Sequence, residues 1–229
     1  EKAYDRLEWS FIKMVLEHFG FSEKMIRLIM SCVSTTTIAL LFNGSKLESF
    51  QPSKGIRQGD PISPYLFLLC MEFLGAQITG MCEDRRWDKV RASRSGPSFS
   101  HVFFADDLML FAKADYKNCE AIIEVLDNFC NLAGQKVNTT KSKILFSSNV
   151  TRGRVRGICR RLGIAATTNL GKYLVFPSFT KEEWGMPLIL WLIKCKISWL
   201  VGWRSKLLSK ASKLVLVKSS AAPVAEYYM

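Results

Sequence analysis

The apolar residues in the first fifty positions form two helical patterns followed by one strand pattern. Residues 12–19 predict an amphipathic helix, and residues 25–29 predict a second helix capped by Ser22. The apolar and β-branched stretch 35–51 is interrupted by Asn43-Gly44, a dipeptide that favours a hairpin turn. We therefore expect two helices and then a β-hairpin. The apolar side of the first helix comprises Ile12, Val15, Leu16 and Phe19.

The middle of the chain predicts two longer helices on either side of a pair of strands. Ser63-Pro64 supplies a favoured cap and first residue for a helix that is apolar on almost every side, so this helix should be central. Residues 83–100 are polar and predict an exposed connection. After the strands, Asp115 can cap a helix that Gly134 ends.

The last part of the chain is basic and mostly helical in pattern. Residues 144–146 and 173–176 predict short strands, and residues 151–162 predict a basic helix. From about Lys181 onward the pattern is helical and basic. These elements indicate an α+β fold, in which a small antiparallel sheet of hairpins, rather than regular βαβ units, is backed by helices and followed by a helical appendage.

The charge is unevenly distributed between the two ends. The chain has 229 residues, of which 48% are hydrophobic and 23% charged, so it is long and apolar enough for a real core. Residues 1–140 hold 16 basic and 17 acidic residues, whereas residues 141–229 hold 16 basic and only 3 acidic residues. This basic half favours a polyanion such as nucleic acid, the alternative being a well-solvated surface.

Other features narrow the class of protein. The seven cysteines are spread singly along the chain and there are only two histidines, so we expect no zinc site. We expect the cysteines to be reduced thiols of an intracellular protein. No apolar run approaches the length of a membrane helix, and we expect no membrane partner and see no targeting signal. The chain begins with Glu, and we expect it to be part of a longer product.

Two adjacent aspartates, Asp106-Asp107, are the main chemical signal. They interrupt the apolar run His101–Phe111, which predicts strand, tight turn and strand. Neighbouring carboxylates repel each other unless a divalent cation lies between them and a further ligand, as in two-metal phosphoryl transfer. An ordinary hairpin turn, where Asp is common, is the alternative.

A second candidate site is the loop Lys54–Pro64, which has two glycines beside Arg57 and Gln58. Glycine lets backbone approach a ligand closely, and the helix that follows has an N-terminus, which favours anions. Gln58 can hydrogen-bond a base or sugar. An ordinary capped loop remains the alternative.

Five segments, taken together and in order, resemble the reverse transcriptases of non-LTR (LINE-type) retrotransposons, most closely those of plants. The resemblance covers nearly the whole chain and includes the stretch 203–211 and the end 227–229. The five segments are Glu1–Asp5, Arg57–Pro64, Phe104–Asp107, Ala133–Ser142 and Lys172–Leu174.

The resemblance implies an RNA-directed DNA polymerase fold. Residues 1–178 would be the palm, truncated at its N-terminus, residues 179–229 would be a helical thumb-like region, and the fingers would be absent. The implied partners are an RNA template, a DNA primer and dNTPs, with two Mg²⁺ or Mn²⁺ ions as cofactors. The family also implies a nuclear location. The oligomeric state is not predicted.

The resemblance also assigns roles to individual residues. Asp106 and Asp107 would be catalytic metal ligands, and Lys141 would belong to the motif credited with protonating pyrophosphate, a surface lysine being the alternative. Tyr4 would be the steric gate that rejects a ribose 2′-hydroxyl, a core aromatic being the alternative. The remaining substrate-binding residues would be Arg57, Gln58 and Gly59, and the nucleic-acid-binding residues would be Tyr173, Leu174, Lys206, Lys210 and Lys213.

Two departures from the family pattern matter. The family places its first catalytic aspartate two residues before the position of Glu1, and it usually has glycine where this chain has Val175. We therefore expect the 229 residues alone not to extend a primer. A degenerate, non-catalytic nucleic-acid-binding remnant is the main alternative, and an intron maturase or telomerase is a further one.

Overall fold

The computed structural model describes most of the first 169 residues and three short strands beyond them. The described residues are 3–91, 96–104, 107–169, 172–173, 176–177 and 195–196. The chain divides into two compact units, Glu1–Ile197 and Ser198–Met229, and the elements below belong to the first. The predicted palm and thumb-like boundaries stay predictions.

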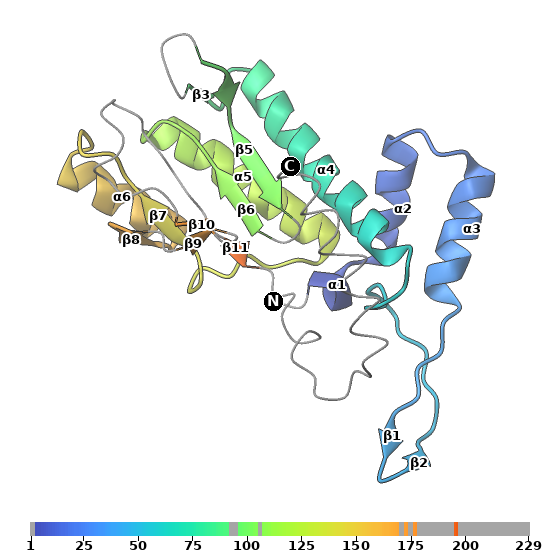
Figure 1. The fold of residues 1–229 in the computed structure, drawn as a ribbon. Helices are drawn as coiled ribbons and strands as arrows, with labels where there is room; N and C mark the ends of the chain where they lie inside the picture. Colours follow the sequence, from blue (N-terminus) through green and yellow to red (C-terminus); the bar gives the residue numbers. More distant parts are fainter. Residues whose placement is uncertain are drawn as a thin grey trace. The chain divides into compact units, whose positions relative to one another are not determined.

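The N-terminal quarter contains three helices and an exposed hairpin (Figure 1). Ser22 caps the third helix by accepting a hydrogen bond from the Met25 backbone N–H, as expected. Ile12, Val15 and Leu16 of the predicted apolar side are buried, whereas Phe19 is the C-cap of the second helix and is 39% exposed. The elements are α1 (Ala3–Arg6), α2 (Trp9–His18), α3 (Glu23–Ser34), β1 (Leu41–Phe42) and β2 (Ser45–Lys46).

The predicted hairpin turn is confirmed. Asn43 and Gly44 both have positive φ, as a two-residue type I′ turn requires, and they join the antiparallel strands β1 and β2. The paired strands are shorter than the expected stretch 35–51, with one further bridge between Ile38 and Phe50. All four strand residues are exposed, so this hairpin adds nothing to the core.

The long helix α4 (Ser63–Glu83) lies at the centre of the fold and packs against α2 and α5 (Tyr116–Ala133), as its apolar pattern predicted. Its N-cap position is Ile62, one residue earlier than expected. The Asp60 side chain accepts from the Ile62 N–H at 3.1 Å and Ser63 is already helical, so the prediction of Ser63 as the cap is wrong. Proline is tolerated at position 64 because the first N–H groups of a helix have no hydrogen-bond partner within the helix.

By length and composition alone, α4 could cross a membrane. This corrects the expectation that no segment approaches that length. Leu66, Cys70, Leu74 and Ile78 are all buried within the core of the fold. Packing between helices therefore accounts for the apolar composition of α4 without a membrane.

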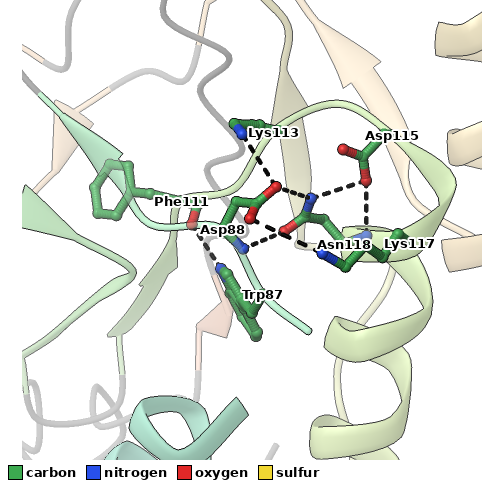
Figure 2. Close-up of polar contacts among 7 residues, drawn as sticks. All are labelled: Trp87, Asp88, Phe111, Lys113, Asp115, Lys117 and Asn118. Carbon is green, nitrogen blue, oxygen red and sulfur yellow. Dashed lines mark hydrogen bonds and ion pairs between the residues drawn. The ribbon is translucent and has the colours of Figure 1, made fainter. Parts of the chain in front are cut away.

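The described part of the segment after α4 is mostly exposed, as its polar composition predicted, but it is anchored to the core at a few residues, which was not predicted. Trp87 is 1% exposed and donates from its indole Nε1 to the Phe111 carbonyl at 2.9 Å (Figure 2). Val90 is also buried, and β3 (Val90–Arg91) pairs with β4 (Ser98–Phe99). These anchors were missed because one large aromatic and one valine fix the segment, whereas the pattern was dominated by its many polar neighbours.

A buried polar network joins this segment to the start of α5 (Figure 2). The fully buried Asn118 accepts from the Asp88 N–H at 2.7 Å and donates to the Asp115 carboxylate at 2.8 Å. Asp115 also accepts from the Asn118 backbone N–H, which confirms it as the cap of α5. Burial alone would raise the pKa of the Asp88 carboxyl, but hydrogen bonds from Lys113 and Asn118 outweigh it and leave this pKa below its ordinary value.

The central sheet has three strands in the order β11-β6-β5. The strands β5 (His101–Phe104) and β6 (Asp107–Leu110) form the predicted antiparallel hairpin. Gly75 of α4 lies against β5, because a Cβ there would approach the His101 and Phe103 side chains to 3.3 Å. The strand β11 (Cys195–Lys196) pairs with β6, so the expectation of a purely helical chain from Lys181 is wrong at these two residues.

The segment after α5 contains a parallel strand pair that the sequence did not reveal. The strands β7 (Lys143–Leu145) and β8 (Ala165–Thr167) are parallel and joined by α6 (Arg152–Leu162). The expectation of hairpins without βαβ units is therefore wrong here, because β8 is short and mostly exposed and gave no strand pattern. The predicted basic helix is confirmed, and Gly163 ends it in the left-handed conformation. We call residues 136–169 the basic unit.

The expected strand 173–176 is instead two short strands. β9 (Lys172–Tyr173) pairs antiparallel with β10 (Phe176–Pro177). Residues 174–175 lie outside the described residues, and because the two described strands are antiparallel to each other, the prediction of a single strand over 173–176 is wrong.

Candidate active site

The hairpin β5–β6 carries the one aspartate of the predicted pair that the structure describes. Asp107 begins β6, faces Phe104 across the hairpin in register, and lies opposite Lys196 of β11. It is half-buried, whereas Leu108, Met109 and Leu110 behind it are buried. Asp106 lies outside the described residues. The hairpin therefore holds the Asp107 carboxylate at the edge of the core, on a strand fixed by both neighbours.

The short helix α1, which contains the first family segment, is held on one side by the start of the Lys54–Pro64 loop. The Gly55 N–H donates to the Leu7 carbonyl at 2.8 Å, and the Ile56 N–H donates to the Tyr4 carbonyl at 2.9 Å. The Trp9 indole donates to the Gly55 carbonyl at 2.7 Å. These hydrogen bonds join two segments about fifty residues apart in sequence.

Gly55 is required at this contact. Its φ is +86°, and a Cβ would lie 2.9 Å from the backbone oxygen of Asp5. Only glycine combines this backbone conformation with so close an approach. We expected the glycines of this loop to let the backbone approach a ligand closely, but Gly55 instead lies against α1.

The opposite side of α1 is held by the segment that follows α5. The Gln135 amide donates to the Ala3 carbonyl at 2.7 Å, and the Arg6 guanidinium donates to the Gly134 carbonyl at 3.0 Å. The Glu8 N–H donates to the Ala133 carbonyl at 3.2 Å. We call residues 3–9, 55–56 and 133–135 the α1 clamp, because two separate segments hold one short helix between them.

The clamp joins two of the five family segments and borders a third. Its residues come from the segments beginning at Glu1 and Ala133 and from the loop that continues into Arg57–Pro64. Sequence reasoning missed the roles of Trp9, Gly55 and Gln135. The order Ala133-Gly134-Gln135 within a family segment was the only available signal.

Tyr4 is buried inside the clamp. Its side chain is 6% exposed, and its ring centroid lies 5.2 Å from that of Phe67 on α4. This packing is the core-aromatic arrangement that was kept as the alternative. The role of Tyr4 as a steric gate stays a prediction.

The predicted substrate loop is exposed beyond the clamp. Arg57, Gln58 and Gly59 are all exposed, and Gly59 has a φ of +89° with open space where a Cβ would lie. The Asp60 side chain then accepts a hydrogen bond from the Ile62 N–H, just before α4 begins at Ser63. The loop is thus fixed at both ends and accessible in the middle.

Lys141 lies in a tight turn organised by Asn138. The Lys141 backbone N–H donates to the Asn138 side-chain oxygen at 3.1 Å, and the Ser142 hydroxyl donates to the Asn138 carbonyl at 2.7 Å. The Lys141 side chain is exposed. Its proposed proton transfer stays a prediction, as does the alternative of a surface lysine.

The other predicted contacts lie mostly beyond the described part of the chain. Tyr173 is paired with Phe176 in the backbone of β9–β10. Leu174, Lys206, Lys210 and Lys213 lie outside the described residues. Their roles in gripping a primer or a duplex stay predictions.

Side chains that could bind a metal ion are dispersed over the described residues. In the described ranges, no three His, Cys, Asp or Glu side chains gather closely enough to hold a metal ion. The Asp107 carboxylate offers the oxygen donors that Mg²⁺ prefers, so its chemistry fits that ion. Asp107 alone does not complete a site.

The cysteines whose side chains the structure describes are free thiols. Cys70 and Cys119 are buried, and burial raises the pKa of their thiols to about 12 and about 11 respectively. At neutral pH these two thiols are protonated and unreactive, and neither can act as a nucleophile.

Comparison with known proteins gives a consistent set of relatives. The family model "Reverse transcriptase (RNA-dependent DNA polymerase)" matches residues 1–177. An uncharacterized mitochondrial protein of Arabidopsis thaliana is 41% identical over 70 residues, which are 31% of this chain and 57% of that protein.

Two further relatives are retrovirus-related Pol polyproteins of retrotransposable elements. The one from the type-2 element R2DM of Drosophila melanogaster is 27% identical over 140 residues, covering 61% of this chain and 12% of the polyprotein. The one from the type-1 element R2 of Popillia japonica is 27% identical over 142 residues, covering 62% of this chain and 19% of the relative. The chain thus spans only part of the length of each relative.

Proposed function

The chain belongs to the reverse transcriptase (RNA-dependent DNA polymerase) family, and on this premise we propose that it forms the palm of the RNA-directed DNA polymerase of a non-LTR retrotransposon. The proposed reaction is transfer of a deoxynucleotide to a primer 3′-hydroxyl opposite an RNA template. We propose a plant origin for the element from the resemblance in sequence. Residues 179–229 would form the thumb-like region.

The observation that carries this proposal is the α1 clamp. It joins two family segments, and the residues just before a third, by hydrogen bonds between residues far apart in sequence, including the 2.7 Å bond from Gln135 to Ala3. The exposed middle of the loop, Arg57 to Gly59, extends from the same clamp. A rigid support of this kind is what positioning of substrate by a polymerase requires.

Asp106 and Asp107 are the residues that would hold Mg²⁺ or Mn²⁺. When bound, a pair of such ions activates a primer hydroxyl and neutralises the charge on the leaving pyrophosphate. The chain itself contributes to this chemistry by holding the Asp107 carboxylate at the start of β6, between strands β5 and β11.

The exposed loop and the buried tyrosine would act on the incoming nucleotide. Arg57 would meet phosphate oxygens, Gln58 and Gly59 would contact template and nucleotide, and Tyr4 would exclude a 2′-hydroxyl. Lys141 would supply a proton to the leaving pyrophosphate from its exposed turn. Each role follows from the family resemblance and is consistent with the exposure of the loop and of Lys141.

We further propose that the 229 residues by themselves do not extend a primer. A two-metal centre needs more carboxylate ligands than one aspartate pair, and the family resemblance names no third ligand among these residues. Loss of a metal ligand commonly lowers such a rate by orders of magnitude, because charge stabilisation supplies much of the catalysis.

Binding of Mn²⁺ tests the proposed site without requiring turnover. Electron paramagnetic resonance should show that the chain with a dNTP binds Mn²⁺ more tightly than the dNTP alone. The double variant Asp106→Asn/Asp107→Asn should lose this gain, whereas the control Asp84→Asn/Asp127→Asn, which removes two exposed carboxylates elsewhere, should keep it. Equal binding by both double variants would contradict the proposed function.

A non-catalytic nucleic-acid-binding remnant is the second candidate, because it requires only the basic charge of the chain. Residues 128–181 contain no acidic residue at all, which suits binding to a polyanion with or without catalysis. RNA binding with no Mn²⁺ gain at Asp106 and Asp107 would support the remnant. A primer-extension assay with Mg²⁺ and an RNA template would show directly whether the isolated chain is inactive.

A further inference from the structure

The basic unit carries a one-sided excess of positive charge. Residues 136–169 contain eight Lys and Arg residues and no acidic residue. Five of the eight are arginines of α6. The predicted active site does not involve this helix.

Two sides of α6 are already occupied by the fold. Ile158 is fully buried. Gly157 lies against Tyr116 of α5, where a Cβ would approach the tyrosine hydroxyl to 2.3 Å. Arg161 lies over the same tyrosine ring at 4.2 Å and pairs with Glu120 at 2.7 Å. These contacts fix the orientation of the helix against α5.

A third side of α6 presents a row of arginines, Arg152, Arg156 and Arg160. They are spaced four residues apart, so they lie on one face of the helix about 6 Å apart along its axis. All three are exposed. Within the described part of the chain, none of the three is paired with an acidic side chain, in contrast to Arg161. We call these residues the arginine row.

The arginine row works against the stability of its own helix. Like charges four residues apart repel, and cations in the first turn oppose the helix dipole. The first turn of α6 holds no acidic residue and Thr151 makes no side-chain cap. A bound polyanion would relieve both penalties at once, whereas a merely solvated surface would be better served by mixed charges.

The first arginine of the row also borders an open crevice at the ends of the parallel strands. This crevice has a volume of about 550 Å³, and Arg152 lines it together with the hydroxyl residues Ser148, Thr167 and Thr168. Hydroxyl groups and arginine are common donors to phosphate oxygens. The crevice thus extends the row with neutral donors.

We propose that the arginine row is a nucleic-acid-binding surface, separate from the predicted active site, that contacts successive phosphates of a single RNA strand. Arginine suits this partner because its planar fork binds phosphate through two hydrogen bonds. The surface reads no base sequence, since phosphate contacts carry none. The proposal rests on the charge and placement of α6, and it holds whether or not the chain catalyses polymerisation.

The test is the salt dependence of binding to a single-stranded 20-nucleotide RNA of mixed sequence. The full chain is compared with Arg152→Gln/Arg156→Gln/Arg160→Gln. Loss of three phosphate contacts should weaken binding on the order of tenfold and reduce the slope of log affinity against log salt by about 2. The triple Lys variant at the same positions should keep the slope.

A matched control removes three exposed cations elsewhere, as Lys24→Gln/Lys46→Gln/Arg91→Gln. This control has the same net charge as the triple Gln variant and should change the slope by less than about 1. Circular dichroism melting of each variant shows that a loss of binding is not a loss of folding.

The proposal is overturned if both triple Gln variants change the slope equally, or if neither does. It is also overturned if the arginine row affects binding to phosphatidylserine vesicles but not to RNA. The Asp106→Asn/Asp107→Asn variant should bind this RNA normally. Failure of the Mn²⁺ test would therefore leave the arginine row supported, and the reverse also holds.

Discussion

The α1 clamp and the basic unit use the same local device for different purposes. Gly134 in the clamp and Gly163 in the basic unit each end a helix in the left-handed conformation, with φ of +69° and +65°. A Cβ at Gly134 would lie 2.7 Å from the Arg6 carbonyl oxygen, whereas at Gly163 there is only open space. The same helix-ending signal is therefore a tertiary contact in one region and a local turn in the other.

This difference indicates what each region contributes. Hydrogen bonds to backbone oxygens and close approaches hold the clamp in one geometry, so it should tolerate few substitutions. The basic unit is held by a few contacts and exposes charges that lower its own stability. We interpret the first as the support of a catalytic centre and the second as a surface whose composition is explained by a partner.

The largest expected effect breaks the clamp. Gly134→Ala combines left-handed strain with a clash against backbone, and should lower the free energy of unfolding by about 3 kcal/mol. Gly163→Ala carries the strain alone and should cost about 1 kcal/mol. Urea denaturation followed by circular dichroism measures both, and equal losses would show that the contact with Arg6 has no energetic weight.

A smaller effect is expected from the buried hydrogen bond of the clamp. Gln135→Ala leaves the Ala3 carbonyl without its partner, and should lower the free energy of unfolding by about 2 kcal/mol. The exposed Gln58→Ala serves as the control and should change stability by less than about 0.5 kcal/mol. If the two substitutions proved equally mild in urea denaturation, the clamp would not depend on Gln135.

In the basic unit, the contact between α6 and α5 should be weak. Arg161→Ala removes an exposed ion pair with Glu120 and the contact over Tyr116, and should cost about 0.5–1 kcal/mol. Repeating the measurement in 1 M salt should reduce the ion-pair part of this loss. A loss above about 2 kcal/mol would place the basic unit in the same class as the clamp.

The smallest effect has the opposite sign. Gly153 lies in the first turn of α6, and the space that a Cβ would occupy there is open. Because alanine restricts the unfolded chain and favours helix, Gly153→Ala should stabilise the chain by up to about 0.5 kcal/mol. Thermal melting measures this gain, and any destabilisation would show that Gly153 has a contact not yet recognised.

The local elements could largely be predicted from the sequence. The helix ends at Ser22, Asp115 and Gly134 and the turn at Asn43-Gly44 follow from side chains that act on their own backbone. The hairpin carrying Asp107 follows from apolar runs on both sides of it.

Features that depend on distant residues could not be predicted. Trp87 is buried because its indole reaches Phe111, and Gly55 is required because α1 lies against it. The parallel partner of β7 was invisible because β8 is short and mostly exposed. For the site, the sequence named residues by family resemblance, whereas the clamp that supports them emerged only from contacts across the fold.

The metal centre is tested most directly by cleavage of the chain with iron(II) bound in place of Mg²⁺. With added hydrogen peroxide and ascorbate, the bound iron(II) generates hydroxyl radicals that cut backbone near the ion. The account predicts cuts around Asp106 and Asp107 together with cuts at Tyr4 and in the loop 57–60. These cuts should vanish in Asp106→Asn/Asp107→Asn and persist in Asp84→Asn/Asp127→Asn. Cleavage that is absent, lies elsewhere, or is unchanged by the first double variant would contradict a metal centre supported by the clamp.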